Sequence, residues 1–521
     1  MFVVMMRARL STRSGSAGRM ISRRLTAMRS TATALMVVAG LAGAIAAVVP
    51  AATAVAAAAV VAPMVVDVTP GVGRPGQTST FHLTGSDFTA TTTVSFGPGT
   101  TVTSVTLVSA TALDVAVAFA ANAAAGTRDV AVQDPPGPVS TLTDAIAVRS
   151  PVGEFHPLTP DRLLDSRLAG QISVGADETR LLTVTGVGGV PANGVAAIVL
   201  NVTATEATAS TYVTVFPAGA AKPEASNLNV DRNETIPNLV TVAVGTSGQV
   251  ALYNHSGQVQ LVVDVAGWYG TATAEPGAAF VPSSAPIRLL DTRIDGTKVP
   301  LGPDESLSLK VTTPGTAVAA AFNITATQPT AATYITVWPS DAPRPVASNL
   351  NVESGQTIPN MVIARLGTDG TVKIYNHSGT AHVIVDLLGV FRNDAIGVLG
   401  GQFEGTVPKR ILDTRTNLGG FAGVPVGAAS KITVAIAGVG GVPAHASSVV
   451  MNVTATDPTA EGYLVVWPSD LDRPTASNLN MVPGKTVPNL VVVPLAPDGT
   501  VDVFNQAGTT HVIFDIVGWY R

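Results

Sequence analysis

One series of short motifs occurs three times in this 521-residue chain, always in the same order. Each copy opens on a phenylalanine and an arginine–aspartate motif, continues through N-x-T-A-T, S-N-L-N and P-N, and closes on a strand with an aspartate. The aspartates of the first motif are Asp165, Asp291 and Asp413, which lie 126 and 122 residues apart. This period is too long for solenoid repeats of about 20–50 residues, and each copy is long enough to hold its own core. The expected repeats are residues 155–270, 280–391 and 403–521.

Within a copy, almost every segment is typical of an extended strand. Residues 239–244 alternate in type, and the last strand of the first copy places valines and Leu261 on one face. Its other face carries Gln258, Gln260, Val262 and Asp264. Such period-2 alternation predicts half-buried antiparallel sheets, with about seven or eight strands per copy. We therefore expect an all-β chain of tandem β-sandwich domains. The alternative is a single closed ring of three β-sheet units, and the short linkers 271–279 and 392–402 are compatible with pseudo-threefold packing.

A further β domain is expected before the repeats, at residues 64–148. Short strands of β-branched residues alternate there with Gly, Pro and Asp turns, a pattern typical of a sandwich. The motifs LTGSDF, TVSFG and AGTRDVAV at residues 83–88, 93–97 and 125–132 resemble those of the immunoglobulin-like TIG domain.

The N-terminal segment has the features of a secretory signal peptide, expected at residues 1–54. It contains seven arginines and no acidic residue, followed by an uncharged apolar run at 32–49 and small residues at 52–54. A basic region, a short apolar region and a small-residue cleavage site together direct secretion. The alternative is an uncleaved membrane anchor, since the apolar stretch continues to Ala62. After cleavage, no membrane span is expected.

Charge and composition exclude several classes of protein. Removing the seven N-terminal arginines from the 30 basic residues leaves 23 against 35 acidic residues, a net charge of −12. An acidic chain of this kind disfavours nucleic-acid binding, which needs a basic face for the phosphates. The chain has no cysteine, which excludes disulfides, thiol nucleophiles and zinc ribbons.

Together, the three-copy motifs resemble the secreted repeat that is abundant in actinobacterial surface proteins. The resemblance covers residues 155–521 and rests on F-x-P, R-L-L-D-T-R, N-V-T-A-T, S-N-L-N, P-N-L-V and V-D-V-A-G-W-Y in fixed order. It implies an extracellular or cell-envelope location and no established activity. Related versions carry cysteines near the first arginine, which this chain lacks.

The strongest candidate site is an arginine–aspartate cluster in each copy. Asp165 and Arg167 share a face of a strand, whereas Arg162 is expected to point the other way. We hypothesise that one of the two arginines pairs with Asp264 on the last strand, because a partly buried carboxylate needs a partner and a guanidinium can bind it through two hydrogen bonds. The pair is either a structural clamp or a repeated ligand site. Its candidate residues are Arg162, Asp165, Arg167, Asp264, Arg288, Asp291, Arg293, Asp386, Arg410, Asp413, Arg415 and Asp515.

Two further sets of residues have alternative interpretations. The asparagines of S-N-L-N and P-N are expected to satisfy loop backbone through side-chain turns, with a carbohydrate-binding loop as the alternative. Asn201, Asn323 and Asn452 lie in N-x-T sequons, but their glycosylation would require eukaryotic secretion, which is not expected. Trp338 and Trp467 each precede a proline, as Phe216 does in the first copy. These aromatic residues are expected to pack in a core, with stacking on sugar rings as the alternative.

No catalytic, cofactor or metal site is expected. The seven histidines do not form H-E-x-x-H or another tight ligand spacing. Asp231 and Glu234 resemble calcium ligands, but the other two copies lack them.

We therefore expect a secreted, non-catalytic cell-surface protein that binds envelope glycan or another surface protein through three weak similar sites. The alternatives are a purely architectural spacer or self-associating layer, and a hydrolase-associated module or an enzyme whose site lies between repeats.

Overall fold

The computed structural model describes residues 61–296, 298–311, 317–393 and 401–521. Within these residues the chain forms strands β1 to β32 and one short 3₁₀ helix, η1 (Thr246–Gly248), with no α-helix. No helix in this part of the chain could cross a membrane. The expected all-β class is confirmed. The expected signal peptide, residues 1–54, lies outside the described residues.

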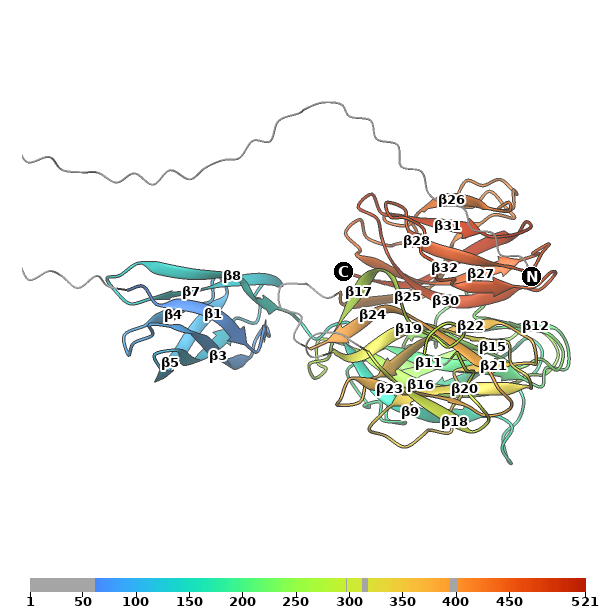
Figure 1. Ribbon diagram of the computed structural model, residues 1–521, viewed down its shortest axis with the longest axis horizontal. Coiled ribbons are helices and arrows are strands. Elements are labelled where there is room, and N and C mark those ends of the chain that lie inside the picture. The colour runs from blue at the N-terminus through green and yellow to red at the C-terminus, as the bar shows by residue number, and fades with distance from the viewer. Residues whose placement is uncertain (1–60, 297, 312–316, 394–400) are drawn as a thin grey trace, which may run out of the picture. The chain divides into compact units, whose positions relative to one another are not determined.

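The first β domain has two four-stranded sheets, in the orders β1-β3-β6-β5 and β2-β8-β7-β4 (Figure 1). Its strands are β1 (Met64–Thr69), β2 (Val72–Gly73), β3 (Thr78–Ser86), β4 (Thr93–Ser95), β5 (Thr100–Ser109), β6 (Ala112–Phe119), β7 (Gly126–Gln133) and β8 (Val139–Val148). Strand β6 alternates between buried and half-buried residues along its whole length. Phe81, Phe96 and Leu113, all fully buried, lie in the core between the sheets.

Each repeat is a sandwich of eight strands in two four-stranded sheets. In the first repeat the inner sheet has the order β14-β11-β16-β9 and the outer sheet the order β10-β15-β12-β13. Its strands are β9 (Phe155–Asp165), β10 (Glu178–Thr183), β11 (Val195–Thr205), β12 (Thr211–Pro217), β13 (Leu228–Val230), β14 (Ile236–Ala243), β15 (Gln249–Asn254) and β16 (Gln260–Gly270).

The second and third repeats have the same topology, with inner sheets β17-β24-β19-β22 and β25-β32-β27-β30. The strands of the second are β17 (Ala279–Asp291), β18 (Glu305–Lys310), β19 (Ala317–Thr327), β20 (Thr333–Pro339), β21 (Leu350–Val352), β22 (Ile358–Arg365), β23 (Thr371–Asn376) and β24 (His382–Arg392). Those of the third are β25 (Phe403–Asp413), β26 (Ser430–Ala435), β27 (Ser448–Thr456), β28 (Gly462–Pro468), β29 (Leu479–Met481), β30 (Val487–Pro494), β31 (Thr500–Asn505) and β32 (His511–Tyr520).

The inner sheets are buried on both faces, which alternation in the sequence did not predict. Strand β16 was expected to expose the face that carries Val262 and Asp264, yet these residues are only 5% and 2% exposed. One face of the sheet packs on the outer sheet of the same repeat, and the other packs on the neighbouring repeats. Burial of both faces explains why strands such as β11 are nearly continuous apolar runs.

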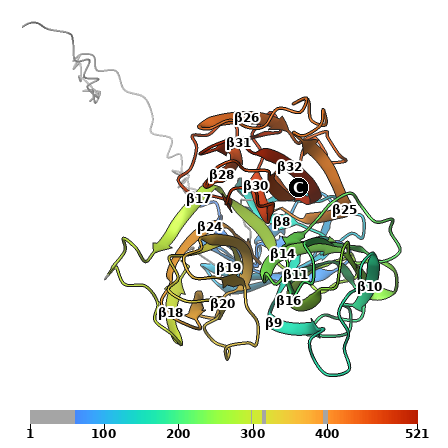
Figure 2. The ribbon, with the colours of Figure 1, turned by 90° about the vertical axis from the view of Figure 1, so that its right-hand side faces the viewer.

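The three repeats close around a common centre (Figure 2). Their inner faces share a separate apolar core, distinct from the core inside each sandwich. Its larger members, three from each repeat, are Phe155, Leu239, Tyr269, Phe280, Met361, Phe391, Phe403, Leu490 and Tyr520. The expected β-sandwich in each copy is therefore confirmed, and the three tandem sandwiches pack against one another in a closed ring.

Backbone bridges also join the repeats cyclically. Phe155 pairs with Ala278, and Phe280 pairs with Gly401, each time linking the first strand of a repeat to the segment before the next one. The Phe403 amide then donates to the Gly153 carbonyl at 2.8 Å, which completes the circle. The side chains of these phenylalanines gather with Tyr269, Phe391 and Tyr520 in an aromatic cluster, in which the two tyrosine hydroxyls lie 2.6 Å apart. The F-x-P and G-W-Y motifs thus belong to ring closure.

The closed ring predicts how a single repeat behaves. A chain of residues 401–521 alone would expose the apolar face that carries Phe403, Leu490 and Tyr520, while retaining both complementary edges of the interface. We expect it to assemble into a homotrimer, because three identical copies can restore the same closed core. Size-exclusion chromatography with light scattering measures this. A monomer that unfolds cooperatively at the temperature of the full chain would contradict the closed ring.

Candidate functional site

The arginine–aspartate cluster joins the first and last strands of each repeat. Arg162 on β9 binds Asp264 on β16 through two hydrogen bonds, with Nε–Oδ1 and Nη2–Oδ2 distances of 2.6 and 3.2 Å. Arg167 binds both oxygens of Asp165 at 2.8 and 2.6 Å. The same pairs recur as Arg288–Asp386 with Arg293–Asp291, and as Arg410–Asp515 with Arg415–Asp413. Of the two arginines proposed to reach the last strand, the first does so in every copy.

A β-bulge changes the direction in which Arg162 points. Asp264 pairs with Arg162 while Val263 pairs with Leu164, so Leu163 is an extra residue on β9. The extra residue brings Arg162 to the same side as Asp165, 3.2 Å from its Oδ2 atom, whereas strict alternation had placed them on opposite faces. The second and third repeats have the same bulge, at Leu289 and Ile411.

The two kinds of aspartate have opposite electrostatic environments. Hydrogen bonds from Arg167 lower the pKa of the Asp165 carboxyl to about 2, and Arg293 lowers the pKa of Asp291. Burial raises the pKa of Asp264, Asp386 and Asp515, although an arginine binds each of them. A carboxylate buried in this way depends on its arginine to remain charged. The bonding capacity of these groups is used inside the protein, which favours the structural clamp over the ligand site.

Replacing Asp264 by Asn tests the clamp in the full chain. The substitution removes a buried charge and leaves Asp165 as the remaining carboxylate partner of the Arg162 guanidinium, so we expect a loss of about 1–3 kcal/mol in the free energy of unfolding. Denaturant unfolding measures this. Asp341→Asn is the control, because Asp341 pairs with Arg365 at the surface and should matter little. Equal stability of the Asp264→Asn variant and the wild type would refute the clamp.

The repeated asparagines connect the repeats rather than their own loops. Asn201 of the first repeat donates to the Ser348 carbonyl of the second at 2.7 Å, Asn323 of the second donates to Ser477 of the third, and Asn452 of the third donates to Ser226 of the first. These side chains are at most 4% exposed, so they are inaccessible to glycosylation. Their partners are far away in the sequence, so the asparagine of each N-x-T motif connects two repeats.

The asparagine of each P-N motif completes this network, which we call the asparagine ring. Its members are Asn201, Asn238, Asn323, Asn360, Asn452 and Asn489. Asn238 donates to the side chain of Asn452 at 3.0 Å and accepts from the Leu490 amide at 3.2 Å. Asn360 and Asn489 make the corresponding contacts with the first and second repeats. The motifs N-x-T, S-N-L-N and P-N are thus three parts of one interface. The only signal for this in the sequence was that they recur together.

Replacing Asn238 by Ala should weaken ring closure. The buried Leu490 amide and the buried Asn452 side chain would each lose a partner, at a cost of about 1–3 kcal/mol in the free energy of unfolding. Thermal or denaturant unfolding checks this, with Asn193→Ala at an exposed loop position as the control. An unchanged stability would show that the asparagine ring does not hold the repeats together.

The aromatic residues that were considered for sugar stacking are buried. Phe216, Trp338 and Trp467 are 4%, 5% and 3% exposed. The Trp338 indole donates to the Ala342 carbonyl and the Trp467 indole to the Leu471 carbonyl, so both rings are covered by the loop that follows them. They pack as core residues, as expected, and they do not offer a stacking face.

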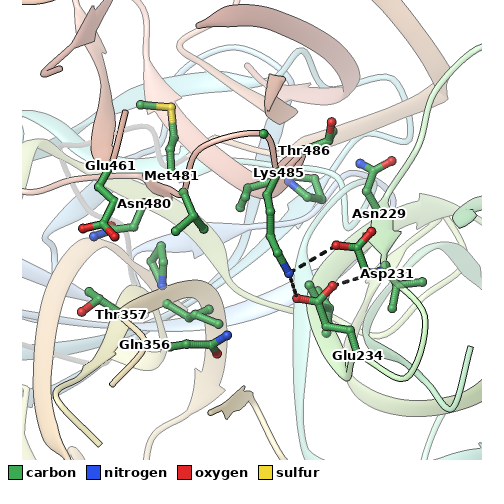
Figure 3. A pocket seen from close by; sticks show the side chains of 18 of the residues that line it. Asn229, Asp231, Glu234, Gln356, Thr357, Glu461, Asn480, Met481, Lys485 and Thr486 are labelled. Atoms are coloured by element: carbon green, nitrogen blue, oxygen red, sulfur yellow. Dashed lines mark hydrogen bonds and ion pairs between the residues drawn. The ribbon is translucent and has the colours of Figure 1, made fainter. Parts of the chain in front are cut away.

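A cavity of about 900 Å³ lies where the three repeats meet, next to the asparagines of the three P-N motifs. All three repeats line it, each with the turn between its fifth and sixth strands, namely β13–β14, β21–β22 and β29–β30 (Figure 3). Its apolar lining comes from the residues next to the ring asparagines, namely Ile236, Pro237, Ile358, Pro359, Val487 and Pro488. Its volume is within the roughly 300–1,000 Å³ of small-ligand pockets.

The polar lining of the cavity differs between repeats. Equivalent positions of the three turns carry Glu234, Gln356 and Lys485. Lys485 binds Glu234 at 2.7 Å and Asp231 at 3.3 Å, a bridge from the third repeat to the first (Figure 3). Burial opposes the charge of Lys485, but these two carboxylates hold its pKa above the ordinary value. The cavity thus has a repeated apolar wall and an unrepeated polar rim.

Little in the sequence indicates this cavity. Asp231 and Glu234 resemble calcium ligands, but the other two copies lack the pair. The structure assigns these acids to an ion pair with Lys485, and no cluster of metal-ligating side chains occurs among the described residues. The signal for the cavity in the sequence is one variable position in an otherwise regular motif, which carries Glu234, Gln356 and Lys485 in the three copies.

One known protein family matches part of this chain. Residues 62–135 match the family of quinohemoprotein amine dehydrogenase, alpha subunit domain III. A search of curated proteins gave no match.

Several solved structures share a weak likeness. The triple jelly roll protein of an archaeal virus is 10% identical over 70% of this chain and 90% of its own, with a TM-score of 0.16. The tandem CBM22 domains of Paenibacillus barcinonensis Xyn10C are 10% identical over 46% of this chain and 99% of theirs, with a TM-score of 0.16. The Bacteroides ovatus protein SGBP-B, solved with a mixed-linkage heptasaccharide, is 12% identical over 63% and 78%, with a TM-score of 0.14. Such low scores add nothing to the argument from this chain's own residues.

Proposed function

We propose that this chain is a secreted, non-catalytic protein of the cell envelope that binds a neutral glycan in the cavity shared by its three repeats. The observation that carries the proposal is the cavity itself. It is formed only when the ring is closed, and it combines an apolar wall with a rim of amides and hydroxyls. Pockets with this combination bind small molecules.

The lining matches the chemistry of a sugar. Asn229, Gln356, Asn480 and Gln506 offer amide groups that can both donate and accept hydrogen bonds, as sugar hydroxyls do. The isoleucine and proline wall suits the apolar face of a sugar ring. The lining contains three carboxylates, those of Asp231, Glu234 and Glu461, and one ammonium group, that of Lys485, so it disfavours anionic polymers.

The ring changes the expected number of sites. Three weak similar sites were expected from the repeated motifs, but those motifs lie in the clamp and in the asparagine ring. The cavity is formed once per chain, from one turn of each repeat, and the polar residues of its rim differ between the repeats. The proposal is therefore one composite site per chain.

Binding is favoured over the two alternatives. A spacer or self-associating layer does not account for a polar cavity at the centre of the ring. An enzyme would need free acid–base groups, whereas two of the three carboxylates in the cavity are bound to Lys485. Secretion is supported by the basic and apolar N-terminal segment, and the envelope location by the resemblance of the repeats.

Filling the cavity tests the proposal. The secreted protein is screened against purified cell walls and neutral oligosaccharides of glucose, galactose, mannose and N-acetylglucosamine. In Gln356→Trp, an indole extends from a lining position, so we expect the affinity for the best sugar to fall at least tenfold. Isothermal titration measures the dissociation constant.

The control is Arg232→Trp, which places the same side chain at an exposed position of the β13–β14 turn in the first repeat, outside the cavity lining. It should bind as the wild type does. If the wild type binds no sugar and no cell wall, or if it shortens the sugars, the proposed function is wrong.

A further inference from the structure

A threonine hydroxyl has the same two partners in the first two repeats. Thr211, at the start of β12, donates to Asn254 Oδ1 at 2.7 Å and accepts from the Ser256 amide at 2.8 Å. Thr333, at the start of β20, makes the same bonds with Asn376 Oδ1 and the Ser378 amide, both at 2.8 Å. The hydroxyl therefore joins a buried asparagine to the turn that follows it.

The third repeat has glycine at this position. Gly462 starts β28, and the matching asparagine and turn residue are Asn505 and Ala507. Asn505 is fully buried, and its Nδ2 atom donates to the carbonyls of Val426 and Gly508 at 2.9 and 3.0 Å.

These bonds hold the Asn505 amide in the orientation of its two counterparts, which bind the matching carbonyls. Its Oδ1 atom is buried and has no hydrogen-bond partner. A buried acceptor in this state is rare and costs stability, so it calls for an explanation.

The unpaired oxygen lies beside the cavity. Gly462, at the start of β28, and Gln506, the residue that follows Asn505 at the end of β31, both line the cavity, and Asn505 pairs with Leu464 of β28. A Cβ atom at Gly462 would lie 3.2 Å from Gln506 Oε1 and 3.4 Å from the Ala507 amide nitrogen. Gln506 is exposed, so its side chain can turn away from this place without breaking the fold.

We propose that Gly462 marks a hydroxyl-binding subsite of the cavity. A hydroxyl of the ligand takes the role of the threonine hydroxyl: it donates to Asn505 Oδ1 and accepts from the Ala507 amide. Both partners are already placed, because the first two repeats hold a hydroxyl with the same pair of groups. The subsite selects a polyhydroxylated ligand, and the inference rests on the proposed sugar-binding function.

Gly462→Thr tests the subsite, because it supplies the hydroxyl from the protein itself. We expect a higher melting temperature, as the two hydrogen bonds form internally, together with at least a tenfold weaker affinity for the sugar that the wild type binds best. Thr333→Gly is the matched control. It creates the same unpaired group in the second repeat, outside the cavity lining, and should lower the melting temperature without changing the affinity.

Deoxy analogues of that sugar give a second measurement that needs no variant. Loss of one particular hydroxyl should weaken binding to the wild type about tenfold, and this loss should be absent in Gly462→Thr. If Gly462→Thr gains stability but keeps the wild-type affinity while Gln356→Trp loses it, the buried oxygen binds water only: the subsite is wrong and the cavity function stands. If Gly462→Thr does not fold, equal binding of all deoxy analogues to the wild type overturns the subsite. If the wild type binds no sugar, both proposals fail.

Discussion

Burial of the inner sheets on both faces is the constraint on which the rest of the structure depends. A sandwich normally buries one face of each sheet and exposes the other to water. Here the second face of each inner sheet is also apolar, and it can leave water only against the corresponding faces of the other two repeats. Closure of the ring follows from this need, and the aromatic cluster around Tyr269 and Tyr520 lies on the same buried surface.

Buried apolar surface alone does not determine how the repeats are rotated against one another. The asparagine ring supplies that information, because amide groups must meet partners at particular distances and angles. Asn201, Asn323 and Asn452 each reach a carbonyl of the next repeat, and the P-N asparagines close the network. The arginine clamp acts inside each repeat, since it ties the first strand to the last and so holds the edge of the inner sheet.

Repetition and variation have separate roles in this chain. Residues that make the clamp and the ring must recur, because each interface needs the same parts. Residues on the rim of the cavity are free to differ, as Glu234, Gln356 and Lys485 do. Gly462 belongs to the second kind: it departs from Thr211 and Thr333 at a place where a hydrogen bond is lost. In this chain, the exceptions to the repeat lie at the proposed ligand site.

The sequence by itself determined the all-β class, the three homologous copies, the sandwich within each copy and the two candidate arginine partners of Asp264, because these follow from alternation, spacing and the need of a buried carboxylate for a cation. It did not determine that the face carrying Val262 is buried. A strand face that packs on another repeat has the same local sequence pattern as any other apolar strand face. The sequence also placed Arg162 on the wrong side, because a bulge at Leu163 is a matter of strand pairing and leaves no mark on periodicity. Only the tertiary structure brought the asparagines together and formed the cavity, because both arise from residues more than a hundred positions apart that meet when the ring closes.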